Sequence, residues 1–394
     1  MDRPLEWTRR ELWLRKLVHP GHTLPTAAAP LAVACGLAAH DGVLRLGPAL
    51  FALAAGWLIQ LGGVLTDNYE NLLREPDDRE HPELVRAVKS GTLTLGSLRL
   101  AILACYALAF VAGLYLLHRA GLGVVAIGLA SIAASWAYSA GPFPVGRHGL
   151  ADPLFFLFFG VVSVAGGYYV QAAAAFGASS GSGFLPEALP FAALALGLPV
   201  GALTTNILII DDIRDREFDA VKGKRTVAVR FGPGRSRAEF AVLLAAAYAA
   251  PLWFWLGLDL GLGSLLPWLT LPFAISTARD VFTRSRYQDL LPTTPKAGRL
   301  LLAYSILLAI GIALPAGRLA HAQSGEDVVR AKCASCHART AQKVGPSLKD
   351  IAAKYKAGPD AEAKLVAEIK ASTHPKVSAT EAELGAAARY VLTP

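Results

Sequence analysis

Long apolar runs recur along this chain and limit what it can fold into. They lie near residues 23–40, 45–66, 94–117, 121–141, 152–174, 188–210, 238–257, 260–278 and 299–319. A run of roughly 17 to 25 apolar residues is long enough for a helix to cross a bilayer. With 54% hydrophobic and 17% charged residues, the 394-residue chain is too apolar for an ordinary soluble protein of this length. We therefore expect an all-α, polytopic membrane bundle of about nine transmembrane helices.

The basic residues lie beside these runs and do not gather on one compact face, so the net charge of +8 does not indicate nucleic-acid binding. They precede the first run and follow the second, fourth, sixth and eighth, whereas the alternate connections are short and nearly free of Lys and Arg. By the positive-inside rule, the N-terminus and the basic loops are cytoplasmic. An odd number of spans then places the residues after about 320 on the periplasmic side of a bacterial inner membrane.

A C-x-x-C-H motif stands near the end of the chain. Cys333, Cys336 and His337 have the spacing that attaches a c-type haem. A disulfide and half of a zinc site are the alternatives, but the histidine directly after the pair and the lack of a second cysteine pair favour haem. Bacterial c-type haem is attached on the outer side of the membrane, which agrees with the expected topology. Cys35 and Cys105 lie within apolar runs and are expected to be buried thiols.

Three carboxylates with helical spacing follow the sixth apolar run. Asp211, Asp215 and Asp219 stand at i, i+4 and i+8, so a helix that continues past the membrane surface carries them on one face. Like charges stacked in this way repel by roughly a few tenths of a kcal/mol per pair, so we expect a cation to offset them. Mg²⁺ is usually held by carboxylates and substrate phosphates. Lys224 and Arg225 are close enough in the chain to hold phosphate oxygens directly.

A second polar turn, DNYENLL, follows the second apolar run on the same side of the membrane. Asp67, Asn68, Glu70 and Asn71 occupy one helical turn, and Arg86 comes after it. Either acidic run alone is typical of a solvated helix face. Two oxygen-rich helix ends with basic residues nearby instead predict a site for a magnesium diphosphate, with the apolar interior of the bundle taking a lipid tail.

Three stretches carry a resemblance to a known family: DNYENLL with its trailing RAVKSG, WAYSAGPFPVGRHGLADPLFFLFFGVVSVAGGYYVQ, and DDIRDREFDAVKGKRTVAVRFG. By these motifs residues 10–320 resemble the UbiA superfamily of intramembrane prenyltransferases, above all its 1,4-dihydroxy-2-naphthoate branch. The resemblance implies Mg²⁺-dependent transfer of a polyprenyl group from polyprenyl diphosphate to an aromatic acceptor. In the naphthoate branch the ring also loses CO₂, which gives demethylmenaquinone for menaquinone biosynthesis.

The first motif of this branch, N-D-Y-x-D, corresponds here to DNYEN, so Asp67 and Asn68 exchange acid and amide and the last Asp is Asn71. The second motif, N-N-x-R-D-x-x-x-D, matches at Asp215 and Asp219 and has acids in place of both amides. We expect the added carboxylates of the second motif to compensate for those missing from the first.

The site that the resemblance implies has three groups of residues. The catalytic residues are Asp67, Asn68, Asn71, Asp211, Asp212, Asp215 and Asp219; the magnesium ligands are Asp67, Glu70, Asp211, Asp215 and Asp219; the diphosphate contacts are Arg86, Lys224 and Arg225. Tyr138 and Tyr168 are candidates for the cavity wall, with packing aromatics as the alternative.

Two domains are expected, a prenyltransferase domain over 1–320 and a c-type cytochrome domain over 321–394. The last segment, from Gly325, resembles a small class I cytochrome c, in which the carbonyl of Pro346 orients the proximal ligand His337. The usual distal Met is missing, because Met1 is the only methionine. His374 is the candidate distal ligand, with an open site, Lys376 or a spectator histidine as alternatives.

The junction ends in an Ala320-x-Ala322 pattern that resembles a signal-peptidase site, so release of the cytochrome and an uncut tether are both open. The haem domain is expected to exchange electrons with the quinone pool or a periplasmic carrier. Other acceptors are 4-hydroxybenzoate, homogentisate or a chlorophyllide. The alternative function is a catalytically inactive membrane anchor for an electron-transfer cytochrome.

Overall fold

The computed structural model describes residues 8, 11–17, 20–75, 81–314, 325–334, 337, 340, 345–355, 360–371, 377, 379 and 381–393. Within these residues the regular structure is entirely helical, as the sequence predicts. The chain divides into two compact units, Met1–Ala316 and Gly317–Pro394. The predicted cleavage pattern Ala320-x-Ala322, and with it Cys336, His374 and Lys376, lies outside the described residues.

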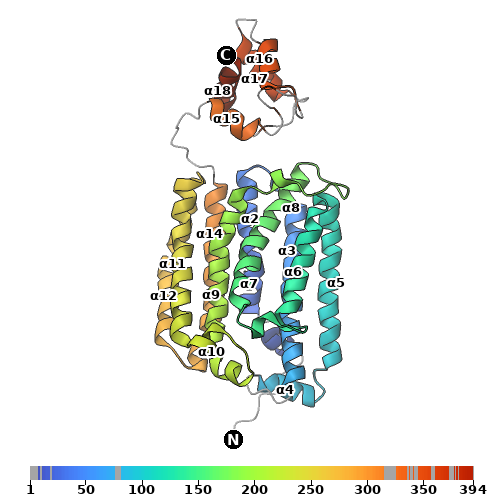
Figure 1. Ribbon diagram of the computed structural model, residues 1–394, viewed down its shortest axis with the longest axis vertical. Coiled ribbons are helices and arrows are strands. Elements are labelled where there is room, and N and C mark those ends of the chain that lie inside the picture. Colours follow the sequence, from blue (N-terminus) through green and yellow to red (C-terminus); the bar gives the residue numbers. More distant parts are fainter. Residues whose placement is uncertain are drawn as a thin grey trace. The chain divides into compact units, whose positions relative to one another are not determined.

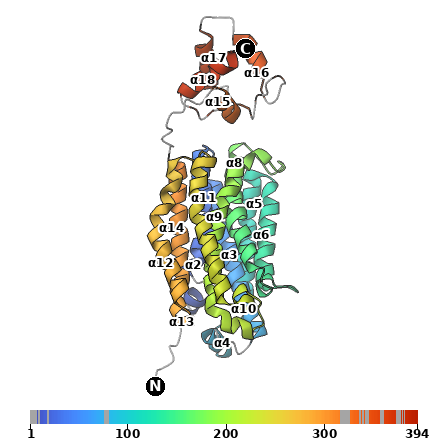
Figure 2. The ribbon, with the colours of Figure 1, turned by 60° about the vertical axis from the view of Figure 1, so that its left-hand side comes forward.

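The first unit is a bundle of long helices that run side by side (Figures 1 and 2). Its elements in chain order are η1 (Leu12–Leu17), α2 (Pro20–His40), α3 (Leu46–Arg74), α4 (Pro82–Lys89), α5 (Leu95–Ala120), α6 (Gly123–Ser139), η2 (Val145–Arg147), α7 (Ala151–Phe155), η3 (Phe156–Val162), α8 (Ser163–Ala175), η4 (Pro186–Ala188), α9 (Phe191–Val221), α10 (Val227–Phe231), α11 (Pro233–Gly257), η5 (Leu262–Thr270), α12 (Leu271–Thr283), α13 (Tyr287–Leu290) and α14 (Thr293–Ala313).

The described residues contain seven helical segments that are long and apolar enough to cross a membrane. The expected count of nine is therefore not confirmed. Helix α6, in the expected span 121–141, has only 17 residues. The expected span 260–278 begins as the 3₁₀ helix η5, which contains Pro267, and becomes α-helical only at Leu271.

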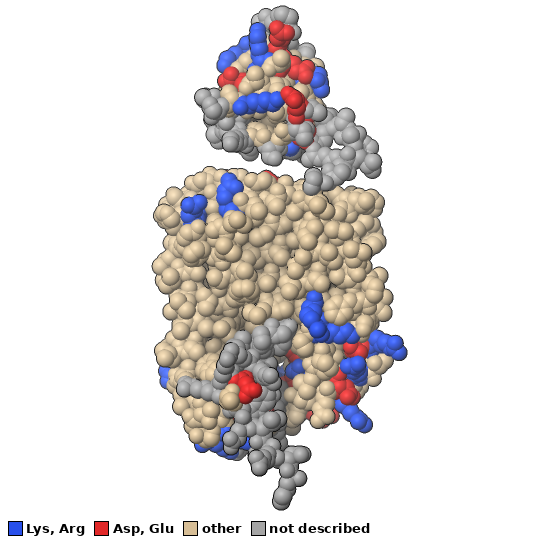
Figure 3. Space-filling model, turned by 180° about the vertical axis from the view of Figure 1, so that it is seen from behind, with Lys and Arg blue, Asp and Glu red and all other residues tan. Residues whose placement is uncertain are grey.

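The outer surface of the bundle fits a bilayer. Figure 3 shows a broad tan band around the middle of this unit, with most of the Lys, Arg, Asp and Glu side chains near its lower end. Large apolar side chains such as Leu100, Leu103 and Phe110 of α5 are exposed on that surface. Exposed apolar area of this extent is stable in lipid and unfavourable in water. The chain is a multi-pass membrane protein.

The central element is α9, and most of its residues are buried. It packs against η3, α8, α11, α14 and α2, while α14 in turn packs along α2, so the last long helix closes the bundle onto the first. Cys105 is buried and Cys35 is partly buried against the hydrophobic core, as the sequence predicts.

Glycines allow η3 and α9 to touch backbone to backbone. A Cβ added at Gly160 would lie 2.5 Å from Gly201 Cα and 2.6 Å from the Gly197 carbonyl oxygen. A Cβ added at Gly201 would lie 2.5 Å from the Phe156 oxygen. Small residues commonly permit such close crossings between membrane helices. This crossing fixes the distance between the η3–α8 wall and α9.

The second unit contains α15 (Gly325–Lys332), α16 (Leu348–Tyr355), α17 (Ala361–Lys370) and α18 (Glu381–Leu392). Helices α15 and α18 pack together through buried Val328, Val329 and Ala387. An ion pair joins them, with Lys332 Nζ 3.1 Å from Glu383 Oε2.

Replacing Gly160 by leucine tests the close crossing. The added side chain would force η3 away from α9, and overpacking of this kind typically costs about 1–3 kcal/mol. We expect Gly160→Leu to lower the midpoint of thermal unfolding in detergent. Gly113→Leu is the control, because a Cβ at Gly113 would meet no atom within 4 Å. Equal midpoints for the two variants would contradict the assigned role of Gly160.

Candidate active site

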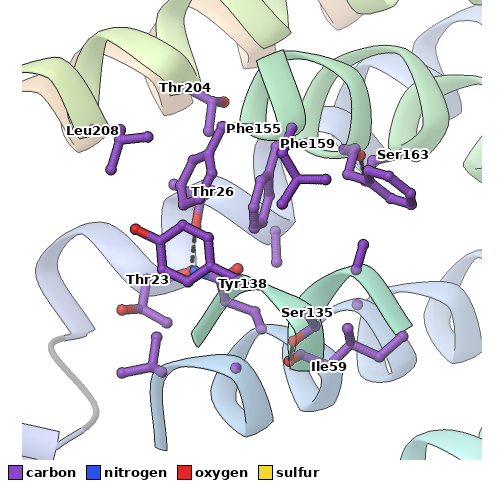
Figure 4. A pocket seen from close by; sticks show the side chains of 18 of the residues that line it. Thr23, Thr26, Ile59, Ser135, Tyr138, Phe155, Phe159, Ser163, Thr204 and Leu208 are labelled. Carbon is purple, nitrogen blue, oxygen red and sulfur yellow. Dashed lines mark hydrogen bonds between the residues drawn. The ribbon is translucent and has the colours of Figure 1, made fainter. Parts of the chain in front are cut away.

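A cavity of about 740 Å³ lies inside the bundle. Its wall comes from α2, α3, α6, the α7–η3–α8 segment and α9, with Leu291 and Thr294 at one end. Figure 4 shows Tyr138, Phe155 and Phe159 projecting into this space, with Thr23 and Thr26 of α2 close by. Carboxylates and amides line one end, and mostly apolar and small side chains line the rest.

The cavity is deep. On α6 its lining residues extend from Tyr138 to Val124. At a rise of roughly 1.5 Å per residue this distance is about 21 Å, a large part of a hydrocarbon core of about 30 Å. The polar end and the apolar depth together suit an amphiphilic molecule with one charged end.

Helix α3 contributes the polar turn that the sequence singles out. Asp67 accepts hydrogen bonds from Ser139 Oγ at 2.5 Å and from Asn71 Nδ2 at 3.1 Å. Asn68 is 8% exposed, and its Nδ2 donates to the Val64 carbonyl at 2.9 Å. Because both amides donate through nitrogen, Asn68 and Asn71 present amide oxygens in addition to the Asp67 carboxylate.

Helix α9 contributes two carboxylates that share one guanidinium. Arg214 donates to Asp215 in a bidentate pair, from Nε at 2.7 Å and from Nη2 at 2.5 Å. Its Nη1 also donates to Asp211, and Thr294 Oγ1 donates to the same Asp211 oxygen at 2.6 Å. The positive charge of Arg214 thus offsets the repulsion that the sequence predicts between these acids.

Lys224 provides the second cation of the site. Its Nζ lies 2.8 Å from Asp219 Oδ1. Burial opposes the charged form of Lys224 and lowers its pKa, but the carboxylates of Asp219 and Asp67 raise the pKa more strongly, to well above its ordinary value. Lys224 therefore remains cationic at physiological pH. It faces acids of both α9 and α3, which places it between the two groups of carboxylates.

The structure brings most of the predicted site residues to one place. Those that line the cavity are Asp67, Asn68, Asn71, Asp211, Asp212, Asp215, Asp219 and Lys224. Tyr138 lines it too, whereas the Tyr168 hydroxyl donates to Asp41 at 2.6 Å and lies outside the lining. Sequence reasoning gave no role to Arg214, Ser139 and Thr294. The short spacing of Arg214 from Asp211 and Asp215 on one helix is the signal that could have identified the arginine.

Three predicted residues lie elsewhere. Glu70 is not part of the cavity lining and pairs with Arg74 one turn later on α3, at 2.9 Å. Arg86 is exposed on α4, and its Nε donates to the Pro82 carbonyl at 3.2 Å. Arg225 lines a separate hollow beside the cavity. The i, i+4 partner on the same helix explains the position of Glu70.

The oxygen donors at the polar end suit a hard cation such as Mg²⁺, which takes carboxylate and amide oxygens. In the described part of the chain, however, no three Asp, Glu, His or Cys side chains already stand in a metal-binding group. Arg214 and Lys224 hold three of the carboxylates in ion pairs. The donor set therefore fits a magnesium ion, provided that these acids exchange a cationic side chain for the metal.

The second unit contains the expected environment of the proximal histidine. The imidazole Nδ1 of His337 lies 2.7 Å from the Pro346 carbonyl oxygen. A carbonyl only accepts, so this contact requires the proton on Nδ1 and leaves the lone pair on Nε2. A Cβ at Gly345 would collide with the His337 ring, which shows how closely the turn encloses it. Cys333 begins the same turn, and its carbonyl accepts from the His337 N–H at 2.9 Å.

A membrane-embedded helical bundle with a carboxylate-lined, otherwise apolar cavity defines a class of intramembrane enzyme. The family model described as UbiA prenyltransferase family matches residues 27–294, and the chain belongs to this family. It is a prenyltransferase, and a cytochrome c domain follows the membrane part. This C-terminal part matches the model described as cytochrome C oxidase, cbb3-type, subunit III, over residues 320–391.

Proteins of similar sequence match both the membrane part and the C-terminal part of this chain. The 1,4-dihydroxy-2-naphthoate octaprenyltransferase of Mycobacterium tuberculosis is 32% identical over 303 residues, which are 75% of this chain and 95% of the relative. The enzyme of the same name from Escherichia coli is 30% identical over 316 residues, or 78% and 96%. Cytochrome c-552 of Nitrosomonas europaea is 35% identical over 83 residues, which are 18% of this chain and 81% of that protein.

Two solved structures share the fold of the membrane unit. The apo structure of a UbiA homolog from Aeropyrum pernix K1 has a TM-score of 0.56 at 20% identity, covering 74% of this chain and 96% of that chain. The UbiA homolog from Archaeoglobus fulgidus bound to GPP and Mg²⁺ has a TM-score of 0.50 at 16% identity, covering 74% and 98%. The prediction of a UbiA-type membrane domain with a C-terminal cytochrome domain is confirmed.

Removing the shared guanidinium tests the charge balance at the polar end. Arg214→Gln leaves Asp211 and Asp215 without their cation, and hydrogen bonds to charged groups are worth about 1.5–3 kcal/mol each. We expect a clearly lower unfolding midpoint in metal-free buffer. Arg284→Gln is the matched control, because Arg284 pairs with Asp280 at 3.0 Å but is 40% exposed, and exposed pairs contribute little. A control that loses as much stability as Arg214→Gln would contradict the proposed balance.

Proposed function

We propose that this prenyltransferase transfers a polyprenyl group from its diphosphate to 1,4-dihydroxy-2-naphthoate, with loss of CO₂, and so makes demethylmenaquinone. The observation that carries the proposal is the convergence of both carboxylate groups, on α3 and α9, at the polar end of one deep apolar cavity. The relatives from Mycobacterium tuberculosis and Escherichia coli are named as 1,4-dihydroxy-2-naphthoate octaprenyltransferases, which supports the naphthoate acceptor.

The diphosphate end of the donor binds at the polar end of the cavity. Asp67, Asp211, Asp215 and Asp219 would hold Mg²⁺, which supplies positive charge to the diphosphate as it leaves. Lys224 remains close to Asp219 and contacts diphosphate oxygens directly. The Archaeoglobus fulgidus homolog binds GPP and Mg²⁺ together, which supports this arrangement.

Arg214 has two roles in this proposal. Without substrate its single positive charge offsets part of the negative charge of Asp211 and Asp215. Asp211 and Asp215 would be among the residues that hold a magnesium ion, and Arg214, which pairs with both, would then be close enough to donate to a phosphate oxygen.

The prenyl tail and the ring occupy the apolar part of the cavity. Phe155, Phe159 and Tyr138 project into the cavity, with Phe155 and Tyr138 ring centroids 5.5 Å apart. Aromatic faces stabilise a developing allylic cation, and the apolar wall keeps water away from it. The naphthoate ring would then attack the allylic carbon from within this aromatic group.

The cytochrome domain is proposed to carry covalent haem c on Cys333 and Cys336. When bound, the haem would supply one-electron redox chemistry. The Pro346 carbonyl orients His337 so that its Nε2 is available to the iron. His374 remains the proposed distal ligand. With the prenyltransferase loops in the cytoplasm and residues 321–394 in the periplasm, the domain would exchange electrons with the quinone pool or a periplasmic carrier.

A catalytically inactive anchor is the second candidate. The altered first motif, with Asn71 where an Asp is usual, favours it. The organised cavity with its two cation-paired acid groups favours an enzyme, because a membrane anchor needs no such site. Another aromatic acceptor, such as 4-hydroxybenzoate, homogentisate or a chlorophyllide, remains the alternative within the enzyme class.

A turnover assay tests the proposed reaction. Purified full-length protein is incubated with 1,4-dihydroxy-2-naphthoate, an all-trans polyprenyl diphosphate and Mg²⁺, and the product mass is measured. We expect a prenylated, decarboxylated product that is absent in Asp215→Ala. Product from another aromatic acceptor alone would replace the naphthoate assignment. No product from any acceptor, with folded and haem-loaded protein, would favour the anchor.

A glycine on the cavity wall allows a test of the tail site. Gly128 of α6 lines the cavity, and a Cβ there would meet no atom within 4 Å. We expect Gly128→Leu to retain transfer from geranyl diphosphate and to lose about tenfold or more in kcat/KM with longer donors, because the side chain fills the tail site. Gly113→Leu, outside the cavity lining, should leave the donor preference unchanged. An unchanged preference in Gly128→Leu would contradict the assigned tail site.

A further inference from the structure

A second hollow, of about 460 Å³, lies beside the active-site cavity. It is formed by the end of α3, the loop before and around η2, and the turn after α9. The charged or titratable side chains that line it are Arg74, Arg147, His148 and Arg225, and the remaining lining residues are glycines and prolines. No carboxylate lines this hollow in the described part of the chain.

The positive charge around the hollow is only partly offset by the described acids. Arg74 pairs with Glu70 at 2.9 Å. Glu75 is shared, since it lies 3.8 Å from Arg147 Nη2 and 3.5 Å from Lys222 Nζ. Among the described residues, Arg147 thus shares the carboxylate of Glu75 with a second cation, and the distance to it is 3.8 Å.

Arg225 adds a fourth cation. Among the described residues its side chain forms no ion pair or hydrogen bond, although its backbone N–H donates to the Arg147 carbonyl at 2.9 Å. His148 is held in place by stacking on Phe143, with ring centroids 3.7 Å apart, and by a 2.8 Å contact between its Nδ1 and the Pro144 oxygen. That contact uses the Nδ1 proton and leaves Nε2 to face other groups. Within the described ranges, Arg225 and His148 are therefore well-placed side chains without an acidic partner.

The hollow and the active site share one turn. Lys224 faces the cavity and pairs with Asp219 at 2.8 Å, while the next residue, Arg225, lines the hollow. Arg147 ties the two loops together, because its guanidinium donates to the Lys222 carbonyl and its own carbonyl accepts from Arg225. A ligand that bridges Arg147 and Arg225 would fix the turn that carries Lys224.

We propose that this hollow is a second anion site, which binds a phosphate group and thereby holds the Lys224 turn in place. The planar guanidinium groups of Arg74, Arg147 and Arg225 suit phosphate oxygens, which they can bind bidentately. The phosphate comes either from an anionic lipid headgroup, for which basic clusters beside membrane helices are typical sites, or from free phosphate in solution. The site is separate from the one assigned to the prenyl diphosphate and does not depend on that proposal.

The test uses full-length protein in detergent and two probes, inorganic phosphate and phosphatidylglycerol. Phosphate binding is measured by calorimetry without divalent metal, and retention of phosphatidylglycerol is measured by native mass spectrometry against phosphatidylcholine. Arg225→Gln is compared with Arg235→Gln, the control, because Arg235 is exposed on α11 and lies outside the hollow. Any anion bound in the active-site cavity persists in both variants and is subtracted.

We expect Arg225→Gln to weaken the binding of one probe by about tenfold or more, with Arg235→Gln close to wild type. Arg225→Lys keeps the positive charge but loses the planar guanidinium, so it should weaken probe binding less than Arg225→Gln does. The lysine variant also provides the test if the glutamine variant does not fold. Loss of lipid retention alone assigns the site to a headgroup, and loss of phosphate binding alone assigns it to a free anion. If neither probe distinguishes the Arg225 variants from the control, the proposal is wrong.

Discussion

The rest of the structure depends on the ion pairs that stabilise several carboxylates inside a membrane-embedded helical bundle. Asp67, Asp211, Asp215 and Asp219 surround the polar end of an apolar cavity, where an unpaired charge would cost several kcal/mol or more. Arg214 and Lys224 offset these charges with contacts from the α9 helix itself and from the turn that follows it. Three of these acids are therefore held in ion pairs with cationic side chains.

The fold around the site serves this arrangement. Helix α9 is the most enclosed long helix and carries three of the acids, so their positions are set by packing on several sides. The contact between Gly160 and Gly201 brings the η3–α8 wall close to α9, while α6 and α3 on the other side leave the cavity open. Close packing near the acids and open space along α6 separate the charged end of the cavity from the apolar part that we propose takes the prenyl tail.

Much of this could be predicted from the sequence, because hydropathy and helical spacing are local properties. The apolar runs predicted the membrane bundle, and the i, i+4, i+8 spacing placed Asp211, Asp215 and Asp219 on the face of α9 that lines the cavity. The contact between His337 and Pro346 has the geometry expected from the cytochrome resemblance. The number of spans is harder to predict, since residues Leu262–Thr270 form a 3₁₀ helix within a run whose composition alone suggests a single α-helix.

The residues that sequence reasoning misplaced are those whose direction depends on tertiary structure. Glu70 belongs to the same turn as Asp67 but faces Arg74, and Arg225 follows Lys224 but faces a different hollow. The i, i+4 partner Arg74 holds Glu70, and the turn after α9 directs Arg225 away from Lys224, so motif membership does not determine which side chain enters a cavity. The same reason explains why Ser139 and Thr294, from α6 and α14, could not be assigned to the site in advance.

The central claim is that a metal-bound diphosphate joins the two acid groups by replacing Arg214 on one of them. A structure of the full-length protein in lipid nanodiscs, with Mg²⁺ and a non-reactive prenyl thiodiphosphate, would test it most directly. The account predicts metal density between Asp67 and the acids of α9, with Arg214 turned from Asp211 or Asp215 toward the diphosphate. A diphosphate bound elsewhere, with Arg214 still paired to both acids and no metal between the two helices, would contradict it.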